Sequence, residues 1–483
     1  MQPLVILRIL GLLMLLSSCT LLPPIATGLI FGDGAVLPFV EAFALTLVSG
    51  FLLYLPVRKH RNELRLRDGF LVVVLFWTVL GVAGGLPIYL SGVQDISITD
   101  AVFESISGIT TTGATVIVGI DELPHSLLLY RQELQWLGGM GIIVLAVAVL
   151  PMLGVGGMQL FRAETPGPVK DTKLTPRITE TAKALWYIYL GLTVACLLAY
   201  WAAGMSFFDA MSHSFSTVAI GGFSTHDASI GHFDSTAIQF VAIVFMLLSG
   251  INFAIHFTAF RNRSLKPYRR DAEFRTYMLV LILVSIVTVG YLQLTHTFDS
   301  TTESIIEGLF QVVSIGTTTG YTTAEYYTWP GFLPVLLLYV SFIGGCSGST
   351  GGGIKVIRIL LLVKQGVREL RRLVHPNAQF AVKIGKKAMP EKVIEAVWGF
   401  FAAYFAISAL LILLLMATGL DQVTAFSAVA ACLNNLGPGL GEVGRNFASI
   451  NDPAKWILCV AMLLGRLEIF TLLVLFSPAF WRK

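Results

Sequence analysis

The chain has 483 residues, of which 55% are apolar and 13% are charged, and its formal net charge at pH 7 is +4. A soluble globular protein carries roughly 25% charged residues, so this composition argues against a soluble enzyme. The Lys and Arg residues stand in short segments between apolar runs, which indicates membrane topology and no nucleic-acid partner. Apolar runs of about 20 residues, long enough to cross a bilayer as a helix, recur along the chain. The sequence therefore predicts an all-α polytopic membrane protein in a lipid bilayer.

The N-terminal region has the pattern of two membrane helices. Apolar segments cover about residues 4–30 and 36–56, and the basic stretch that follows them places both ends of this hairpin inside. A bacterial lipoprotein signal also ends in a cysteine such as Cys19. Apolar sequence continues well past Cys19, however, so an uncleaved helix explains the segment better. We expect a transmembrane hairpin over residues 1–68.

After the hairpin, a unit of three parts appears four times: a long apolar segment, a shorter half-polar segment that ends in a Gly-containing loop, and a second long apolar segment. The expected repeats cover residues 69–165, 166–270, 271–385 and 386–483. The expected spanning segments are 69–92 and 126–155, 184–203 and 235–260, 276–296 and 331–363, and 394–418 and 454–478. With the hairpin, these make ten spans.

The connectors between spans differ in charge. Those near 160–183, 261–275 and 364–392 are basic, and the positive-inside rule places them in the cytoplasm. The opposite connectors are acidic, and Arg445 is their only Lys or Arg. An even number of spans then puts both termini in the cytoplasm. Acidic outer loops would also raise the local cation concentration at a pore mouth.

The four loops align on one glycine each. Small residues stand 12 positions before these glycines, and oxygen-bearing side chains that suit the start of a helix stand 13 positions before. The aligned positions are Gly113, Gly222, Gly320 and Gly437, then Ala101, Ala210, Gly308 and Ala425, then Asp100, Asp209, Glu307 and Thr424. Each short segment is therefore predicted to be a re-entrant half-helix that ends in a loop. The irregular backbone of such a loop is tolerated at membrane depth only when it is buried in protein or faces water.

This pattern suits an alkali cation that leaves water. Such an ion needs a ring of hard oxygen ligands, which backbone carbonyls provide. Glycine permits positive φ and so lets successive carbonyls turn toward an axis. Four half-helices that aim their C-terminal ends at one point add the negative ends of their dipoles. Ordinary Gly/Thr turns are the alternative for a single loop, but four matched loops favour a selectivity filter.

The same residues resemble the Trk/Ktr/HKT superfamily of potassium transporters, and within it the bacterial TrkH/TrkG branch. The resemblance covers essentially the whole chain. It rests on the loops TTTGATV, AIGGFSTH, TTTGYTT and NNLGPGLG and on the strings RDGFLVVVLFWTVLG, ETPGPVKDTKLTPRI, FIGGCSGSTGGGIKVIRILLL and GRLEIFTLLVLF. The resemblance implies an ion channel for potassium uptake across the bacterial inner membrane.

The resemblance also implies that K+ is bound by carbonyls at and just before each filter glycine, without an organic cofactor. Carried over by position, the ion-binding residues are Thr111, Thr112, Gly113, Ile220, Gly221, Gly222, Thr318, Thr319, Gly320, Asn435, Leu436 and Gly437. Glycine in all four loops goes with potassium preference in the family, whereas serine in the first loop goes with sodium transport in some plant relatives. The filter signature of tetrameric potassium channels has two shared glycine positions, whereas the four loops of this chain have one shared position. Fewer well-ordered ion sites should discriminate less sharply between ions. We therefore predict that rubidium permeates well and sodium detectably.

A run of small residues, Gly344–Gly353, interrupts the third repeat's second long segment and is a poor helix former. Close packing of helices is one explanation, but ten such residues in a row favour a flexible intramembrane gate. A phosphate-binding loop is excluded, because Ile354 separates Gly353 from Lys355 and Val356 stands where Ser or Thr is required. The resemblance likewise implies a gating loop beneath the filter. The expected gate residues are Gly345, Cys346, Ser347, Gly348, Ser349, Thr350, Gly351, Gly352, Gly353, Lys355 and Arg466.

Several charged residues need separate interpretation. Arg466 lies inside the last spanning segment, where a charge is costly and usually faces a cavity or a partner. A local pair with Glu468 is the alternative, but residues two apart on a helix point to different faces. By resemblance, Arg466 projects into the pore below the filter as a barrier to cations. Arg131 and Glu133 are expected to be structural. The histidines at 213, 226 and 232 lack a zinc-type spacing and are expected to be solvated loop or pore-helix residues.

The resemblance implies a homodimer and a cytosolic, nucleotide-binding regulatory subunit of the TrkA type, which the basic connectors would dock. Two other functions remain open. A symporter that couples potassium to protons or sodium usually needs an ionisable residue at its site, and the aligned loops contain none. A membrane-embedded hydrolase built on the Ser-Gly-Ser-Thr sequence would need a base, and no neighbouring span offers a His. We therefore expect a transport protein that is not an enzyme.

Overall fold

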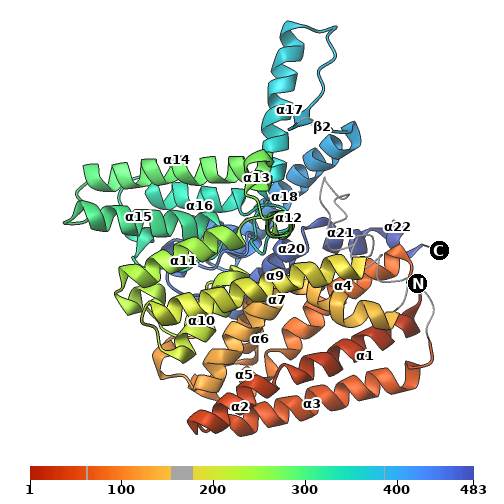
Figure 1. Cartoon of the computed structure of the whole chain (residues 1–483). Helices are drawn as coiled ribbons and strands as arrows, with labels where there is room; N and C mark the ends of the chain where they lie inside the picture. Colours follow the sequence, from red (N-terminus) through yellow and green to blue (C-terminus); the bar gives the residue numbers. More distant parts are fainter. Residues whose placement is uncertain (61–63, 154–177, 386, 483) are drawn as a thin grey trace.

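The computed structural model describes residues 1–60, 64–153, 178–385 and 387–482, and most of these residues are helical. The expected boundary between the first two repeats, at 165/166, lies outside the described residues, as does most of the basic connector near 160–183. The other expected domain boundaries stay predictions. Both chain ends lie on the same side of the molecule (Figure 1), where Arg67 Nη1 donates a 2.6 Å hydrogen bond to the carbonyl of Arg482.

The expected N-terminal hairpin is present. It consists of α1 (Pro3–Cys19), α2 (Leu22–Phe31), α3 (Val36–Tyr54) and the short 3-10 helix η1 (Leu55–Val57). The two arms approach closely at small residues, since a Cβ added to Gly11 would lie 2.7 Å from the backbone nitrogen of Tyr54. Small residues at such contacts let membrane helices pack backbone to backbone.

Each repeat contains a long first helix, a short half-helix and a second helix. Repeat 1 has α4 (Leu66–Ala83), α5 (Leu86–Leu90), η2 (Val93–Asp95), α6 (Ile98–Ile109), η3 (Ile120–Glu122) and α7 (His125–Leu153). Repeat 2 has α9 (Ile178–Ala202), α10 (Phe207–Ala219), η5 (Ser229–Phe233), α11 (Thr236–Ser249), α12 (Phe253–Asn262) and α13 (Lys266–Arg270).

Repeats 3 and 4 follow the same order. Repeat 3 has α14 (Ala272–Leu294), α15 (Thr301–Gly316), η6 (Tyr326–Thr328), α16 (Leu333–Ile343), α17 (Val356–Val374) and a hairpin of two short antiparallel strands, β1 (Lys383–Ile384) and β2 (Lys387–Ala388). Repeat 4 has α18 (Glu391–Ala417), α19 (Gln422–Leu433), η7 (Gly441–Val443), α20 (Asp452–Arg466), α21 (Phe470–Phe476) and α22 (Pro478–Trp481).

The four half-helices, α6, α10, α15 and α19, begin in the same way. The side chain of the N-cap residue accepts a hydrogen bond from a backbone N–H in the first turn, which satisfies one of the unpaired donors there. The caps are Ser97, Ser206, Ser300 and Asp421. Three helices begin within three residues of the expected start. The start expected at Glu307 is wrong, because the hydroxyl of Ser300 caps α15 and the helix begins at Thr301.

The number of continuous spans is smaller than the ten expected. Among the described residues, six helices are long and apolar enough to cross a membrane, or eight if two bent pairs are each counted as one span. The difference arises because the second helix of every repeat is interrupted. The interruptions are non-helical dihedral angles at Gly141 (φ 35°, ψ −114°), a 94° bend between α11 and α12, the loop between α16 and α17, and a 114° bend between α20 and α21.

Only the interruption in the third repeat was expected from the sequence. The spanning segments predicted at 235–260 and 454–478 are each apolar enough to span but are broken by a sharp bend. The span predicted at 331–363 also ends differently, because α17 continues to Val374 and projects away from the bundle (Figure 1).

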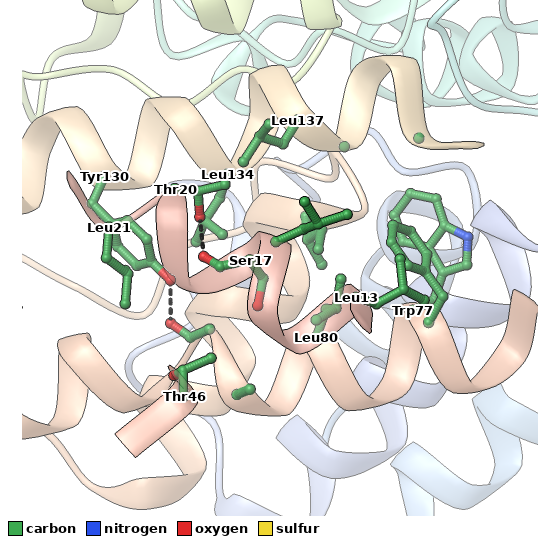
Figure 2. A pocket seen from close by; sticks show the side chains of 17 residues that line it. Leu13, Ser17, Thr20, Leu21, Thr46, Trp77, Leu80, Tyr130, Leu134 and Leu137 are labelled. Carbon is green, nitrogen blue, oxygen red and sulfur yellow. Dashed lines mark hydrogen bonds between the residues drawn. The ribbon is translucent and has the colours of Figure 1, made fainter. Parts of the chain in front are cut away.

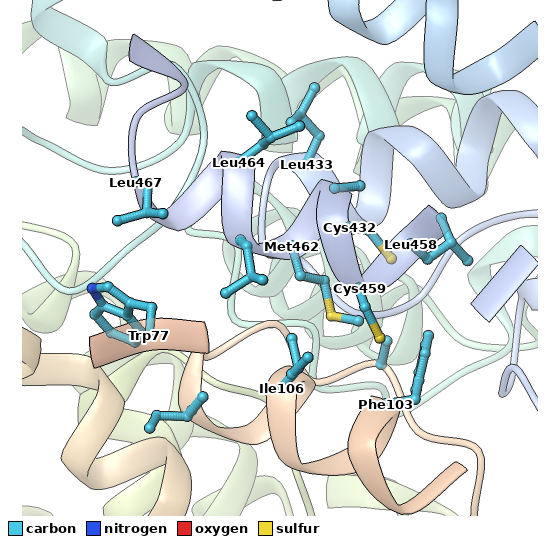
Figure 3. Packing of buried hydrophobic residues seen from close by; sticks show 14 of the residues in the cluster. Trp77, Phe103, Ile106, Cys432, Leu433, Leu458, Cys459, Met462, Leu464 and Leu467 are labelled. Carbon is cyan, nitrogen blue, oxygen red and sulfur yellow. The ribbon is translucent and has the colours of Figure 1, made fainter. Parts of the chain in front are cut away.

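The repeats pack in a closed order. The second helix of each repeat packs against the half-helix of the next: α7 on α10, α11 on α15, α16 on α19, and α20 back on α6. Figure 3 shows the contact that closes the ring, where Cys432, Leu458 and Met462 lie among the same apolar side chains as Phe103 and Ile106. The four half-helices are therefore arranged around one axis.

Candidate ion-conduction site

The loops that follow the half-helices share one backbone conformation. We call them glycine loops 1 to 4, residues 110–115, 219–224, 317–322 and 434–439. In each loop, φ is positive at the glycine and at the residue two positions before it. These pairs are Thr111 (56°) and Gly113 (80°), Ile220 (56°) and Gly222 (81°), Thr318 (69°) and Gly320 (83°), and Asn435 (52°) and Gly437 (97°). Positive φ at a non-glycine residue costs about 1–3 kcal/mol and concentrates at functional sites.

The intervening residue is held in the same way in all four loops. Its backbone N–H donates to the carbonyl five residues earlier, inside the half-helix. These bonds join Thr112 to Ser107 (2.8 Å), Gly221 to Ser216 (2.9 Å), Thr319 to Ser314 (2.8 Å) and Leu436 to Ala431 (2.8 Å). Where left- and right-handed residues alternate, N–H groups gather on one side of the chain and carbonyls face the other. The N–H side faces the half-helix, so the carbonyls face away from it.

The glycines close a ring of loops. A Cβ on Gly113 would overlap the carbonyl oxygen of Gly221 in loop 2, and a Cβ on Gly222 would overlap that of Thr319 in loop 3. The same relation holds from Gly320 to Leu436, and from Gly437 back to Thr112 at 2.8 Å. Each glycine thus faces the carbonyl that precedes the next loop's glycine. The structure brings all twelve predicted ion-binding residues together in this ring.

Polar side chains from α6 and α7 support the ring from behind. The buried carboxylate of Glu104 forms a 2.8 Å ion pair with buried Arg131 and accepts a 3.0 Å hydrogen bond from the backbone N–H of Val116. Arg131 also donates to the carbonyl of Ser224 (3.2 Å) and lies over the ring of Phe223. This contact network joins loops 1 and 2, which agrees with the structural role expected for Arg131.

Gln135 binds loop 2 directly, a contact that no pattern in the sequence predicts. Its Nε2 donates to the carbonyl of Gly221 (2.6 Å), and its Oε1 accepts from the Ser216 hydroxyl (2.7 Å) and the Phe223 N–H (3.0 Å). One buried amide therefore satisfies three groups of the half-helix and its loop.

Two features flank the ring. On one side, residues of all four loops line a cavity of about 650 Å³, which we call the vestibule. On the other side lies a loop formed by residues 344–355, which we call the inner loop. The inner loop donates hydrogen bonds to glycine loops 3 and 4 and to the half-helix α10. These bonds run from the Gly352 N–H to Thr318 Oγ1 (2.7 Å), from the Gly353 N–H to the Asn434 carbonyl (3.0 Å) and from the Thr350 hydroxyl to the Val218 carbonyl (3.0 Å).

The inner loop is anchored to repeat 2 by the Cys346 N–H, which donates to the Gly250 carbonyl (2.8 Å), and to the start of repeat 3 by Glu273. Glu273, at the start of α14, accepts hydrogen bonds from the N–H groups of Ser347 (2.7 Å) and Ile357 (3.1 Å). The ammonium of Lys355 donates to the carbonyl of Gly351 within the loop. Of the predicted gate residues in this loop, Gly352 and Gly353 therefore lie against the ring, whereas Cys346, Ser347 and Gly348 are hydrogen-bonded to repeat 2 and to α14.

Arg466 ends α20 beside the same loop. Its guanidinium donates to Thr111 Oγ1 (3.4 Å) in glycine loop 1, to the carbonyl of Thr350 (3.3 Å) in the inner loop, and to the carbonyl of Gly138 in α7. Its Cζ lies 5.2 Å from the centre of the Trp77 ring. The predicted gate residue Arg466 thus joins glycine loop 1, the inner loop and the break in α7.

Glu468 has a partner from a different repeat. Its carboxylate pairs with Arg358, near the start of α17, and the Arg358 guanidinium lies 4.3 Å from the ring centre of Phe400. This pair joins the bend between α20 and α21 to the helix that leaves the inner loop.

The histidines were expected to be solvated loop or pore-helix residues, and His213 lies on the pore helix α10 while His226 and His232 lie in the outer loop of repeat 2. His213 is buried in α10, where its Nε2 lies 2.9 Å from the Ser224 hydroxyl. His226 and His232 stack with ring centres 3.5 Å apart, and both approach Asp121 of repeat 1. No regular spacing in the sequence signals this cluster, because its members come from two repeats.

Hydrogen bonds and charges within the cluster beside the vestibule shift the pKa values of its side chains. Burial lowers the pKa of the His226 imidazole, but the hydrogen bonds and charges of Asp209 and Asp121 outweigh burial and raise it above its ordinary value. Burial raises the pKa of Asp121, but hydrogen bonds from His226 and from the Asp227 N–H outweigh that effect and lower it. The cluster therefore favours a positive charge at the ring of His226.

A second cavity, of about 280 Å³, lies between the N-terminal hairpin, α4 and α7 (Figure 2). Leu13, Leu21, Trp77, Leu80 and Leu134 dominate its lining, which suits hydrocarbon and not a cation. The Tyr130 hydroxyl in its lining donates to the Gly84 carbonyl (2.9 Å), and the buried indole N–H of Trp77 is a donor and so offers no ligand to a cation. We assign this cavity no part in ion conduction.

Comparison with known proteins agrees with this geometry. Residues 37–483 match the family model TrkH, described as a cation transport protein. The chain is 60% identical over 480 residues to the Trk system potassium uptake protein TrkH of Vibrio parahaemolyticus, covering 99% of each chain, and 42% identical over 473 residues to TrkG of Escherichia coli K12, covering 98% of this chain and 97% of that one. The crystal structure of the potassium transporter TrkH from Vibrio parahaemolyticus superposes with a TM-score of 0.91 at 57% identity over 100% of both chains. This chain therefore belongs to the TrkH family of cation transport proteins.

Proposed function

We propose that this protein takes up potassium ions through the ring of glycine loops, with the ions bound by backbone carbonyls. The observation that carries the proposal is the closed cycle in which each loop glycine faces the carbonyl preceding the next loop's glycine. A dehydrated K+ ion needs several oxygen ligands arranged around it, and four loops of equal conformation supply them. The names of the relatives, which are potassium uptake proteins, support the same ion.

The inner loop and Arg466 are proposed to control passage beneath the ring. The inner loop contacts glycine loops 3 and 4 and the end of α10, while Arg466 contacts loop 1. A cation leaving the ring on this side meets the inner loop and a guanidinium charge. Opening the path requires the loop to exchange these hydrogen bonds for others, so the gate has a defined closed conformation.

The proposed setting is the bacterial inner membrane, with both termini in the cytoplasm, a homodimeric assembly and a cytosolic nucleotide-binding subunit of the TrkA type. The basic connectors and the direction of α17 support a cytosolic partner. Helix α17 projects from the bundle and carries Lys364, Arg368, Arg371 and Arg372 (Figure 1). Leu370 and Leu373 on the same helix are 65% and 79% exposed, which leaves an apolar surface for a partner.

A symporter coupled to protons or sodium is the second candidate. Among the described residues, the glycine loops contain no Asp, Glu, His, Lys or Arg, so a coupling proton would have to bind elsewhere. The carboxylate of Glu104, behind glycine loop 1, is occupied by its ion pair with Arg131. These observations favour conduction over coupled transport.

The test is rubidium uptake into liposomes that contain the purified protein. In the variant Gly113→Ser, the added side chain meets the Gly221 carbonyl and the left-handed backbone becomes strained, so selectivity for rubidium over sodium should fall. The control is Gly34→Ser, because Gly34 has the same φ of 80° and nothing within 4 Å of an added Cβ. Uptake that potassium competes away, with selectivity lost only in Gly113→Ser, supports the proposal.

Two outcomes would contradict it. If the native chain takes up no rubidium, even with a cytosolic regulator added, the glycine loops are structural turns. If the two serine variants behave alike, the effect of Gly113→Ser reflects general backbone strain and not ion coordination. Sodium uptake into the same liposomes tests the expectation from the sequence that sodium permeates detectably.

A further inference from the structure

Asp121, His226 and His232 form a compact group of metal-ligating side chains at the vestibule. Their ligand atoms all lie within 4.8 Å of one another. The Nδ1 atoms of both histidines face the same carboxylate oxygen of Asp121, at 2.5 Å for His226 and 4.0 Å for His232. The two rings are stacked 3.5 Å apart in this structure, and a turn of their side chains would bring both Nδ1 atoms to one ion beside Asp121. Two imidazole nitrogens and one carboxylate oxygen are a ligand set that Zn²⁺ uses with water in the remaining position.

A second carboxylate stands behind the group. The Nε2 atom of His226 is buried and lies 3.5 Å from Asp209 Oδ1, with which it pairs. In protein metal sites, the second ring nitrogen of a ligating histidine usually faces such a carboxylate, which orients the ring. His226 is therefore placed as a metal ligand would be, with one nitrogen toward the ligand group and the other toward Asp209.

The positions of the ligands are set by backbone contacts between two repeats. The N–H of Asp227 donates to Asp121 Oδ2 (3.2 Å), and the N–H of Gly119 donates to Asp227 Oδ1 (3.0 Å). These reciprocal bonds hold the outer loop of repeat 1 against that of repeat 2. The two loops therefore present their ligands without requiring a large rearrangement.

We propose that Asp121, His226 and His232 bind a transition-metal dication of the Zn²⁺ class at the vestibule. Imidazole ligands favour such metals over Mg²⁺ and Ca²⁺, which prefer oxygen ligands. The nearby carboxylates of Asp209 and Asp227 give the site a negative surrounding that attracts a dication. Metal binding requires the stacked rings of His226 and His232 to turn about their side-chain bonds so that both Nδ1 atoms face the ion.

A metal bound there would act on the ion path. His226 and Asp227 line the same cavity as Gly113 and Gly222 of the ring. A dication in this wall repels monovalent cations that enter the vestibule and links the outer loops of repeats 1 and 2. This consequence deepens the proposed function and rests on it, whereas metal binding itself does not.

The first experiment measures binding of ZnCl₂ to the purified full-length protein by isothermal titration calorimetry. The native chain should bind Zn²⁺, and excess CaCl₂ should not compete. His232→Gln and Asp121→Asn should each weaken binding on the order of tenfold or more, since each removes one ligand. The control is His296→Gln, because His296 is exposed and stands outside the group; this variant should bind as the native chain does.

The proposal fails if native protein binds no Zn²⁺, or if His232→Gln and His296→Gln bind equally. Thermal unfolding without metal checks that the variants are folded, and His232 is suited to this test because its side chain is 45% exposed. Rubidium uptake with and without ZnCl₂ then tests the consequence: Zn²⁺ should reduce uptake severalfold in the native chain and not in His232→Gln. Absence of uptake without Zn²⁺ would overturn the proposed transport function, while calorimetry would still decide the metal site.

Discussion

The backbone N–H of Gly352 donates a 2.7 Å hydrogen bond to the side-chain oxygen of Thr318, which joins the inner loop to the ring of glycine loops. Thr318 is one of the four strained residues with positive φ in that ring. A Cβ on Gly352 would overlap the carbonyl of Asn434 in glycine loop 4, so only glycine permits this approach. Movement of the inner loop therefore changes the surroundings of two glycine loops at once.

Removing the anchor of the inner loop should increase ion flux. Glu273→Ala deletes the acceptor for the N–H groups of Ser347 and Ile357. A hydrogen bond to a charged group contributes about 1.5–3 kcal/mol, so loss of the pair should shift the closed-to-open equilibrium on the order of tenfold or more toward open. The measurement is the initial rate of rubidium uptake into liposomes, with Glu395→Ala, an exposed carboxylate on α18, as the control. An unchanged or lower rate in folded Glu273→Ala protein would contradict a gating role for the loop.

Removing the charge beneath the ring should also increase flux. At an effective dielectric constant of 20 and a separation of roughly 8 Å, one positive charge opposes a monovalent cation by about 2 kcal/mol. Arg466→Ala should therefore raise conductance in single-channel recordings. Arg466→Lys keeps the charge but loses the planar set of donors that reaches Thr111 and Thr350. If Lys behaves as Ala does, the guanidinium acts as a structural link and not as an electrostatic barrier.

The amide of Gln135 should be needed for selectivity. Gln135→Leu leaves the Phe223 N–H and the Ser216 hydroxyl without their acceptor and frees the carbonyl of Gly221. Each unsatisfied buried group costs about 1–3 kcal/mol, so loop 2 should lose its conformation and the rubidium-to-sodium uptake ratio should fall.

A neighbour on the same helix provides the matched control. Gln132 is buried, and its side-chain amide has no hydrogen-bond partner among the described residues. The same replacement, Gln132→Leu, should therefore keep the uptake ratio of the native chain. Equal loss of selectivity in both variants would mean that selectivity depends on the presence of polar side chains in α7 and not on the hydrogen bonds between Gln135 and loop 2.

The buried ion pair should matter more for stability than for ion choice. Arg131→Leu leaves the carboxylate of Glu104 unpaired in the interior, which typically costs 3–5 kcal/mol. The thermal unfolding midpoint should fall sharply, and Glu104→Gln combined with Arg131→Leu should recover part of the loss. The control, Arg372→Ala, removes an exposed pair with Glu369 and should change little. No difference between the two single variants would contradict the supporting role of the pair.

The repeat organisation was predictable because it depends on features that act locally. Apolar length determines whether a helix can span a bilayer, and this identified the hairpin and the first helix of each repeat. One aligned glycine per loop predicted positive φ at Gly113, Gly222, Gly320 and Gly437, which the structure has. The same alignment did not predict the start of α15. The N-cap position depends on hydrogen-bond geometry, and the Ser300 hydroxyl caps the helix well before Glu307.

The breaks in the second helices depended on tertiary contacts. Hydropathy continues through Leu467 and Ile469, so the sequence there looked like one span, yet α20 ends and the chain bends by 114°. The break brings Arg466 to glycine loop 1 and Glu468 to Arg358 of repeat 3. Such partners are more than a hundred residues apart in the chain, and no local pattern records them.

The sequence by itself determined that this is a four-repeat membrane protein with one glycine loop per repeat, since spanning length and glycine conformation are properties of short segments. Only the tertiary structure decided which carbonyl faces which glycine, where the inner loop lies, and that Asp121, His226 and His232 meet. The reason is that contacts between repeats depend on how the helices pack around the common axis, and residues that meet there need no regular spacing along the chain.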